Sequence, residues 1–290
     1  FTEEGAFIHA AAGTHCDTPV HLLFLSTADT NDAAYPRIHI LIERASEVSV
    51  IEQHAGLGHG DYFRNVVVES VVEEDGQLRH YKLQEEGVEA RHFAAAYARV
   101  ARGGNYEHHY FGFGGALVRS NIHTVLDDEH AECTVNGVFI PMDRQHMDHH
   151  TVIDHAKPHC NSHELYKGIL LDSARGVFSG RIIVREDAQK TDARQSNNNL
   201  LLSDDAQIDT RPQLEIWADD VKCTHGATVG RIDEDALFYL RSRGIPEEQA
   251  NNILSYAFAS ELLSHVKLPA LREHLDRMIH QRLERSWKTS

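Results

Sequence analysis

A cysteine and a histidine two residues apart, Cys223 and His225, are the side chains in this sequence best suited to bind a soft metal ion. The segment that holds them, residues 218–230, has the composition of a β-strand, and strand side chains two positions apart project from the same face. A thiolate and an imidazole on one face can share a metal such as iron or zinc. A complete zinc site needs about four ligands, so the others would have to come from another segment or another subunit. The alternative is structural: a small buried cysteine and a hydrogen-bonded histidine that are only neighbours in a strand.

A second group of possible ligands lies between His146 and His163. His146, Asp148 and His150 would share one face of a strand. Further candidates follow closely: His149, His155, His159, Cys160 and His163. This His146–His163 cluster could form the metal centre of a β-helical metalloenzyme, although the HExxH signature is absent. A packed or solvated β-surface is the other interpretation.

Other catalytic signatures are missing from the sequence. The glycine-rich residues 111–115, FGFGG, lack the GxxxxGK[ST] pattern that cradles phosphates, and no helix is expected to follow them. There is also no GxSxG elbow. We therefore expect neither ATP hydrolysis nor serine-hydrolase chemistry from this chain.

The composition limits the class of protein. The 290 residues are 41% hydrophobic and 25% charged, which is typical of a globular protein. A formal charge of −16 argues against a nucleic-acid partner, since phosphate binding needs a basic stripe. Four scattered cysteines are too few for a disulfide framework, and no apolar run reaches the roughly 18 residues that span a bilayer. We expect a cytoplasmic protein without a membrane segment, although the chain starts at Phe1 and a preceding portion can be missing.

Short strand-like runs separated by turn residues fill the chain up to about Val229. Even residues 85–102, which could pass as a helix, are better read as a strand among strands. Many strands without intervening helices leave a sandwich, a barrel or a parallel β-helix. The asparagine run at residues 195–202, QSNNNLLL, favours the β-helix, because polar residues at a corner followed by a buried strand are typical of a solenoid.

The C-terminal residues have a helical pattern instead. Asp233 can cap a first helix that Gly244 would end, and Pro246 suits the first position of a second helix. Apolar residues then recur at helical spacing to Leu283. We predict a β core over residues 1–230 and a small helical domain over residues 231–290, whose apolar stripe is either core or a docking face.

Three stretches resemble the SufB/SufD family of iron–sulfur cluster assembly proteins, and its SufD branch in particular. They are residues 148–151 with 157–168 (DHHT, KPHCNSHELYKG), residues 180–182 with 189–202 (GRI, QKTDARQSNNNLLL), and residues 211–216 with 219–228 and 235–245 (RPQLEI, DDVKCTHGAT, DALFYLRSRGI). The likeness is dense over residues 148–263 and looser back to residue 1.

The resemblance implies a right-handed parallel β-helix with a C-terminal helical domain; the N-terminal helical region of the family is not evident in this chain. It implies a non-catalytic scaffold that pairs with SufB and docks the ATPase SufC, which would hydrolyse the ATP. His225, with Cys223 as a weaker candidate, would then contribute to a transient iron–sulfur cluster or iron at the SufB–SufD interface. The predicted SufC-docking residues, which the resemblance places on the C-terminal helices, are Leu237, Tyr239, Tyr256 and Phe258.

Two hypotheses from other classes stay open beside the scaffold. One is the metalloenzyme built on the His146–His163 cluster, and the other is a carbohydrate-binding or carbohydrate-cleaving β-helix, which only two tryptophans argue against. The sequence also leaves open the type of cluster, and whether the chain forms a homodimer when SufB is absent.

Overall fold

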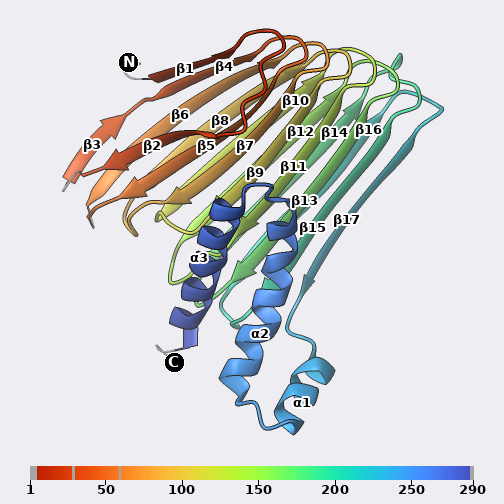
Figure 1. Ribbon diagram of the computed structural model, residues 1–290. Coiled ribbons are helices and arrows are strands. Elements are labelled where there is room, and N and C mark those ends of the chain that lie inside the picture. Colours follow the sequence, from red (N-terminus) through yellow and green to blue (C-terminus); the bar gives the residue numbers. More distant parts are fainter. Residues whose placement is uncertain (1–4, 28–29, 59, 288–290) are drawn as a thin grey trace.

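Two parallel β-sheets face each other through most of the chain and form a flattened solenoid (Figure 1). The computed structural model describes residues 5–27, 30–58 and 60–287. The strands of the first sheet are β1 (Gly5–Ala10), β3 (Thr30–Ala34), β4 (Arg37–Ile42), β6 (Asp61–Val72), β8 (Arg91–Val100), β10 (Leu117–Leu126), β12 (His146–His155), β14 (Arg175–Val184) and β16 (Gln207–Ile216). Those of the second are β2 (Val20–Ser26), β5 (Glu47–Gly56), β7 (Gln77–Glu85), β9 (Asn105–Gly112), β11 (Glu132–Phe139), β13 (Asn161–Leu170), β15 (Asp192–Leu201) and β17 (Lys222–Gly230). The prediction of a parallel β-helix is confirmed, and the ambiguous residues 85–102 contain strand β8.

Each turn of the solenoid passes once through each sheet, so strands two apart in the sequence become hydrogen-bonded neighbours. Residues in register are separated by about one turn of chain, from 26 residues between β8 and β10 to 32 between β14 and β16. Most corners are tight and contain one residue in the left-handed region, such as Asp75, His130 or His159. The corner sequences share this left-handed backbone conformation and little else. The amino-acid sequence therefore shows no strict repeat.

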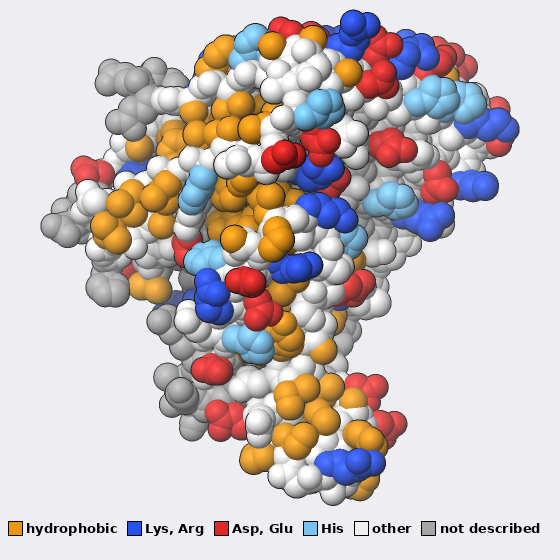
Figure 2. All heavy atoms as spheres, in the orientation of Figure 1, with side chains coloured by type: hydrophobic (Ala, Val, Ile, Leu, Met, Phe, Trp, Pro, Cys, Tyr) orange, Lys and Arg blue, Asp and Glu red, His pale blue; other side chains and the backbone are white. Residues whose placement is uncertain are grey.

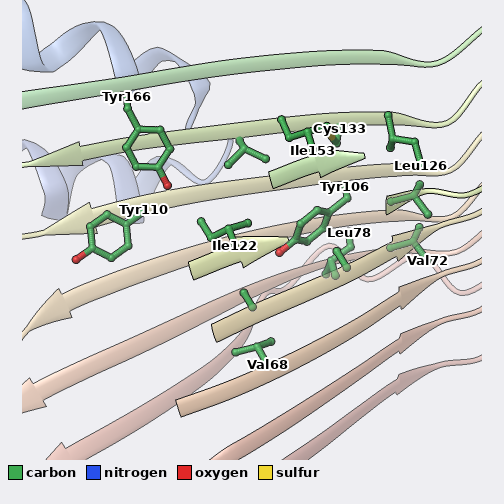
Figure 3. Packing of buried hydrophobic residues seen from close by; sticks show 14 of the residues in the cluster. Val68, Val72, Leu78, Tyr106, Tyr110, Ile122, Leu126, Cys133, Ile153 and Tyr166 are labelled. Carbon is green, nitrogen blue, oxygen red and sulfur yellow. The ribbon is translucent and has the colours of Figure 1, made fainter. Parts of the chain in front are cut away.

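Every second residue of a strand points into the solenoid. Aliphatic residues such as Val68, Leu78 and Ile122 stack there with the rings of Tyr106, Tyr110 and Tyr166 (Figure 3). Burial of stacked apolar side chains contributes roughly 25 cal/mol for each Å² removed from water. The interior is the main hydrophobic core of the molecule.

A charged network is buried inside the N-terminal half of this core. The carboxylate of Glu52 lies 2.7 Å from the Lys82 ammonium, 2.8 Å from His80 Nε2 and 2.6 Å from His54 Nε2. Burial would raise the pKa of Glu52, but the Lys82 charge and the hydrogen bonds from the two histidines hold it well below its ordinary value. Glu52 is therefore ionised and fully paired in the folded protein.

Helices α1 (Glu234–Ser242), α2 (Glu247–Ser260) and α3 (Pro269–Trp287), with the short 3₁₀ helix η1 (Glu261–His265), follow the last strand. α2, η1 and α3 cover the outer face of the second sheet, where Figure 1 shows α2 and α3 in front of β9–β13. Their apolar residues share one cluster with outward-facing residues of β7, β9, β11 and β13: Tyr81, Leu83, Phe111, Val138 and Ile169. Lys167 of β13 adds a polar link, because its ammonium pairs with Glu261 and donates to the Phe258 carbonyl oxygen at 2.9 Å.

Four local predictions can be compared with the structure. The Asp233 side chain accepts from the Ala236 amide at 2.9 Å, as expected of a helix cap, and Gly244 follows the end of α1 with φ +85°. Pro246 is the residue before α2 and not its first helical residue. The asparagines were expected at a corner, but Asn197 and Asn199 lie within β15 and point into the solenoid, where their amides hydrogen-bond each other at 2.6 Å.

Candidate functional site

The C-terminal end of the solenoid is open. β16 and β17 are the last strands of their sheets, and each has a strand neighbour on one side only among the described residues. Inward-facing residues are buried on β14 and β15, whereas on β16 and β17 they are half-buried or exposed. Val229 is 49% exposed and Trp217, just after β16, is 58% exposed. A free β-edge with uncovered apolar side chains is a surface on which another chain can pair.

Cys223 and His225 both lie on this last strand, at alternate positions that face the interior side. Cys223 is in register with Ala193 and contacts the core, while His225 is in register with Gln195 and is exposed. Partial burial and the nearby charge of Asp192 raise the pKa of Cys223, so its sulfur is a thiol at neutral pH. The imidazole of His225 is the more available ligand of the two.

Cys223 and His225 cannot complete a metal site by themselves. Within residues 5–27, 30–58 and 60–287, no group of three or more His, Cys, Asp and Glu side chains is placed to hold a metal ion. A strand rises about 3.3 Å per residue, so the two side chains start about 7 Å apart. A metal bound here would need further ligands beside these two.

A second exposed apolar surface lies on helix α1. Phe238 is 74% exposed and Tyr239 is 55% exposed, and Ile253 of α2 is also exposed. Figure 2 shows hydrophobic side chains gathered on the lobe where Figure 1 places α1. Leu237, one of the predicted docking residues, is half-buried on the same helix. We call the surface formed by Phe238 and Tyr239 the α1 patch.

The other two predicted docking residues serve the packing of the helices. The Tyr256 hydroxyl donates to Asp276 of α3, and its ring stacks on His280 with the ring centres 4.0 Å apart. The Phe258 ring lies under the Lys167 ammonium, 4.4 Å from its centre. Both rings are half-buried, so each keeps part of its surface accessible, and their role in docking stays a prediction.

The comparisons with known proteins identify the family. Residues 24–258 match the model of the SufBD core domain, described as SUF system FeS cluster assembly. The chain belongs to the SufBD core domain family. It is 40% identical to the iron–sulfur cluster assembly protein SufD of Escherichia coli over 88% of the chain. It is 33% identical to an iron–sulfur cluster assembly SufBD family protein of Synechocystis over 94% of the chain, and 32% identical to the chloroplastic protein ABCI7 of Arabidopsis thaliana over 88%.

These SufBD relatives are longer than the chain. It covers 60% of the E. coli protein, 62% of the Synechocystis protein and 56% of the Arabidopsis protein. The matched residues 24–258 include Cys223, His225 and the α1 patch. None of the described helices combines the length and apolarity that crossing a membrane requires.

In this SufBD core the histidines of residues 146–163 do not form a metal centre. His146, Asp148 and His150 share the outward face of β12, as predicted, but Asp148 is paired with Arg119 at 2.7 Å and with His150 at 2.8 Å. His149 points inward among aromatic rings, and burial lowers its pKa to about 3. His155 also points inward, 2.8 Å from the Ser162 hydroxyl. Among the described residues these side chains form no group of three or more that could hold a metal ion, so the structure offers no ligand set for the metalloenzyme hypothesis.

Two features of the site were missed in the sequence. Phe238 is the most exposed residue of the α1 patch, and only its exposure distinguishes it from its neighbours. Gln195 and Glu164 lie directly beneath His225 in the solenoid. Their separations in the sequence, 31 residues from Glu164 to Gln195 and 30 from Gln195 to His225, each match one turn of the solenoid, but the length of a turn is known only from the structure.

Proposed function

We propose that this chain is a non-catalytic scaffold subunit of the SUF machinery in the cytoplasm, where it helps to assemble iron–sulfur clusters together with SufB and the ATPase SufC. The observation that carries the proposal is the open end of the solenoid with His225 on its last strand, in a chain of the SufBD family. The cluster is cargo on this view, and ATP hydrolysis belongs to SufC.

The open end is the proposed surface for SufB. Free edges of β16 and β17 offer backbone donors and acceptors, and residues such as Val229 and Trp217 offer apolar area. A second β-helix that abuts this end would cover both. When SufB is absent, the same surface can support a homodimer, because a self-complementary edge pairs with its own copy.

His225 is the proposed ligand or contact for a transient cluster, and Cys223 is the secondary candidate. An imidazole and a thiolate both bind iron. The raised pKa of Cys223 favours His225, since the thiol must lose its proton before it binds. An incomplete ligand set suits a scaffold, because a cluster held partly by another subunit can be released when the subunits separate.

The test is cluster formation by the chain produced together with SufB and SufC. His225→Ala should lower the yield of cluster about tenfold or more, in the range seen when groups around a metal are removed. His163→Ala is the matched control, because His163 is an exposed histidine on β13 at the outer face. Equal yields from wild type and His225→Ala, with the complex intact, would remove His225 from this role.

A further inference from the structure

Three polar side chains form a column inside the C-terminal end of the solenoid. Glu164 on β13 is in register with Gln195 on β15, and Gln195 is in register with His225 on β17. All three occupy inward-facing positions, and neighbouring strands lie about 4.8 Å apart. Glu164 and Gln195 are buried, and His225 occupies the exposed top of the column.

The two ends of the Gln195 amide have different surroundings. Gln195 Nε2 donates to Glu164 Oε2 at 2.6 Å, so one end of the amide is held by the carboxyl group beneath it. The other end, Gln195 Oε1, is buried and has no hydrogen-bond partner among the described residues. A buried carbonyl oxygen without a hydrogen-bond donor costs free energy. His225 occupies the position in register with Gln195 on the neighbouring strand β17.

The opposite sheet leaves room for the amide of Gln195. Gly180 on β14 faces it across the interior, and a Cβ atom at this position would lie 2.4 Å from Gln195 Nε2. A side chain here would therefore displace the amide. The absence of a side chain at Gly180 and the carboxyl group of Glu164 together set the position of Gln195.

We propose that Gln195, held in place by Glu164, is a positioning residue for His225. Gln195 Oε1 has no donor among the described residues; a turn of the exposed His225 ring that brings its N–H to this oxygen would fix the tautomer and direct the second ring nitrogen out of the solenoid end. Metal-binding histidines are commonly held in this way by a carbonyl or carboxyl group, which also makes the free nitrogen more basic. The inference rests on the proposed function for its purpose, but the proposed hydrogen bond involves this chain alone and can be tested without SufB or SufC.

The direct test is nitrogen-15 NMR of the full chain without iron, recorded over a pH series so that the neutral form of His225 is identified by its own titration. His225→Gln assigns the signal by removing it. We expect a single His225 tautomer in the wild type, and the mixture of a solvated imidazole in Gln195→Leu and Gly180→Ala. Gly226→Ala is the control and should behave as the wild type, because a Cβ at Gly226 meets nothing within 4 Å. A solvated mixture in the wild type would overturn the proposal, even if the Gln195→Leu variant does not fold.

Cluster yield in the complex with SufB and SufC separates this inference from the proposed function. Gln195→Leu should lower the yield about tenfold. If His225→Ala lowers the yield while Gln195→Leu changes neither the yield nor the tautomer, positioning by Gln195 is refuted and the function stands. If the tautomer depends on Gln195 but His225→Ala leaves the yield unchanged, the hydrogen bond is supported and the assembly role of His225 is refuted.

Discussion

Replacing Glu52 with alanine should lower the free energy of unfolding by about 3–5 kcal/mol, the loss expected when one partner of a buried ion pair is removed. Glu52 is fully buried, and so is Lys82, whose ammonium lies 2.7 Å from it. Without the carboxylate, the Lys82 charge would remain inside the solenoid with no opposite charge at hydrogen-bonding distance among the contacts described for it. His54 and His80 would also lose their common partner.

Urea unfolding followed by circular dichroism measures this effect. Glu69→Ala is the matched control, since its pair with Arg37 lies on the outer surface and is worth less than about 1 kcal/mol. The double variant Glu52→Leu with Lys82→Met should recover most of the stability, because it removes both charges and leaves apolar side chains. A loss below 1 kcal/mol in Glu52→Ala would show that the network is not held as described.

The SufC docking that we propose for the C-terminal helices predicts that replacing Phe238 with aspartate weakens SufC binding at least 30-fold, which corresponds to about 2 kcal/mol for a central aromatic contact. Phe238 is the most exposed large apolar residue in α1, and Tyr239 is next to it. Nothing described in the chain packs over this ring, so the substitution should leave the fold intact. Surface plasmon resonance with SufC, together with the melting temperature of the variant, measures both effects.

Phe7→Asp is the matched control for this substitution. Phe7 is also a highly exposed phenylalanine, but it lies on β1 at the opposite end of the solenoid. Deletion of all the helices would be a poorer test, because they cover Tyr81, Phe111 and Ile169 of the second sheet and the truncated protein would expose that cluster. Unchanged SufC affinity in Phe238→Asp would place the docking surface elsewhere.

The local features of the fold could be predicted from the sequence. Strand-length runs, the Asp233 cap and the shared face of Cys223 and His225 each depend on residues close together in the chain. The family resemblance then distinguished a β-helix from a sandwich or a barrel, which local patterns cannot do.

Features that depend on strand register could not be predicted. The corner positions were unknown, so the asparagines of β15 were assigned to a corner and the column under His225 was not recognised. The covering of the second sheet by helices could not be predicted either. Strands such as β13 are apolar on both faces at their C-terminal ends because helices cover them, and a sequence pattern alone does not reveal what provides the cover.

The sequence also does not show which of the predicted docking residues on the helices are exposed. Tyr239, Tyr256 and Phe258 look equivalent in the sequence, since each is an aromatic residue in a helical segment. Only the packing distinguishes the exposed Tyr239 from Tyr256, which is tied to α3, and Phe258, which is tied to β13 through Lys167.

Pulsed EPR of the reduced cluster tests the central claim most directly, namely that His225 contributes to a site shared between subunits. The complex would contain this chain labelled with nitrogen-15 histidine, beside unlabelled SufB and SufC. We predict a nitrogen-15 hyperfine coupling from one imidazole, and its loss in His225→Gln. A cluster without this coupling, or a coupling that persists in His225→Gln, would contradict the assignment of His225 to the assembly site.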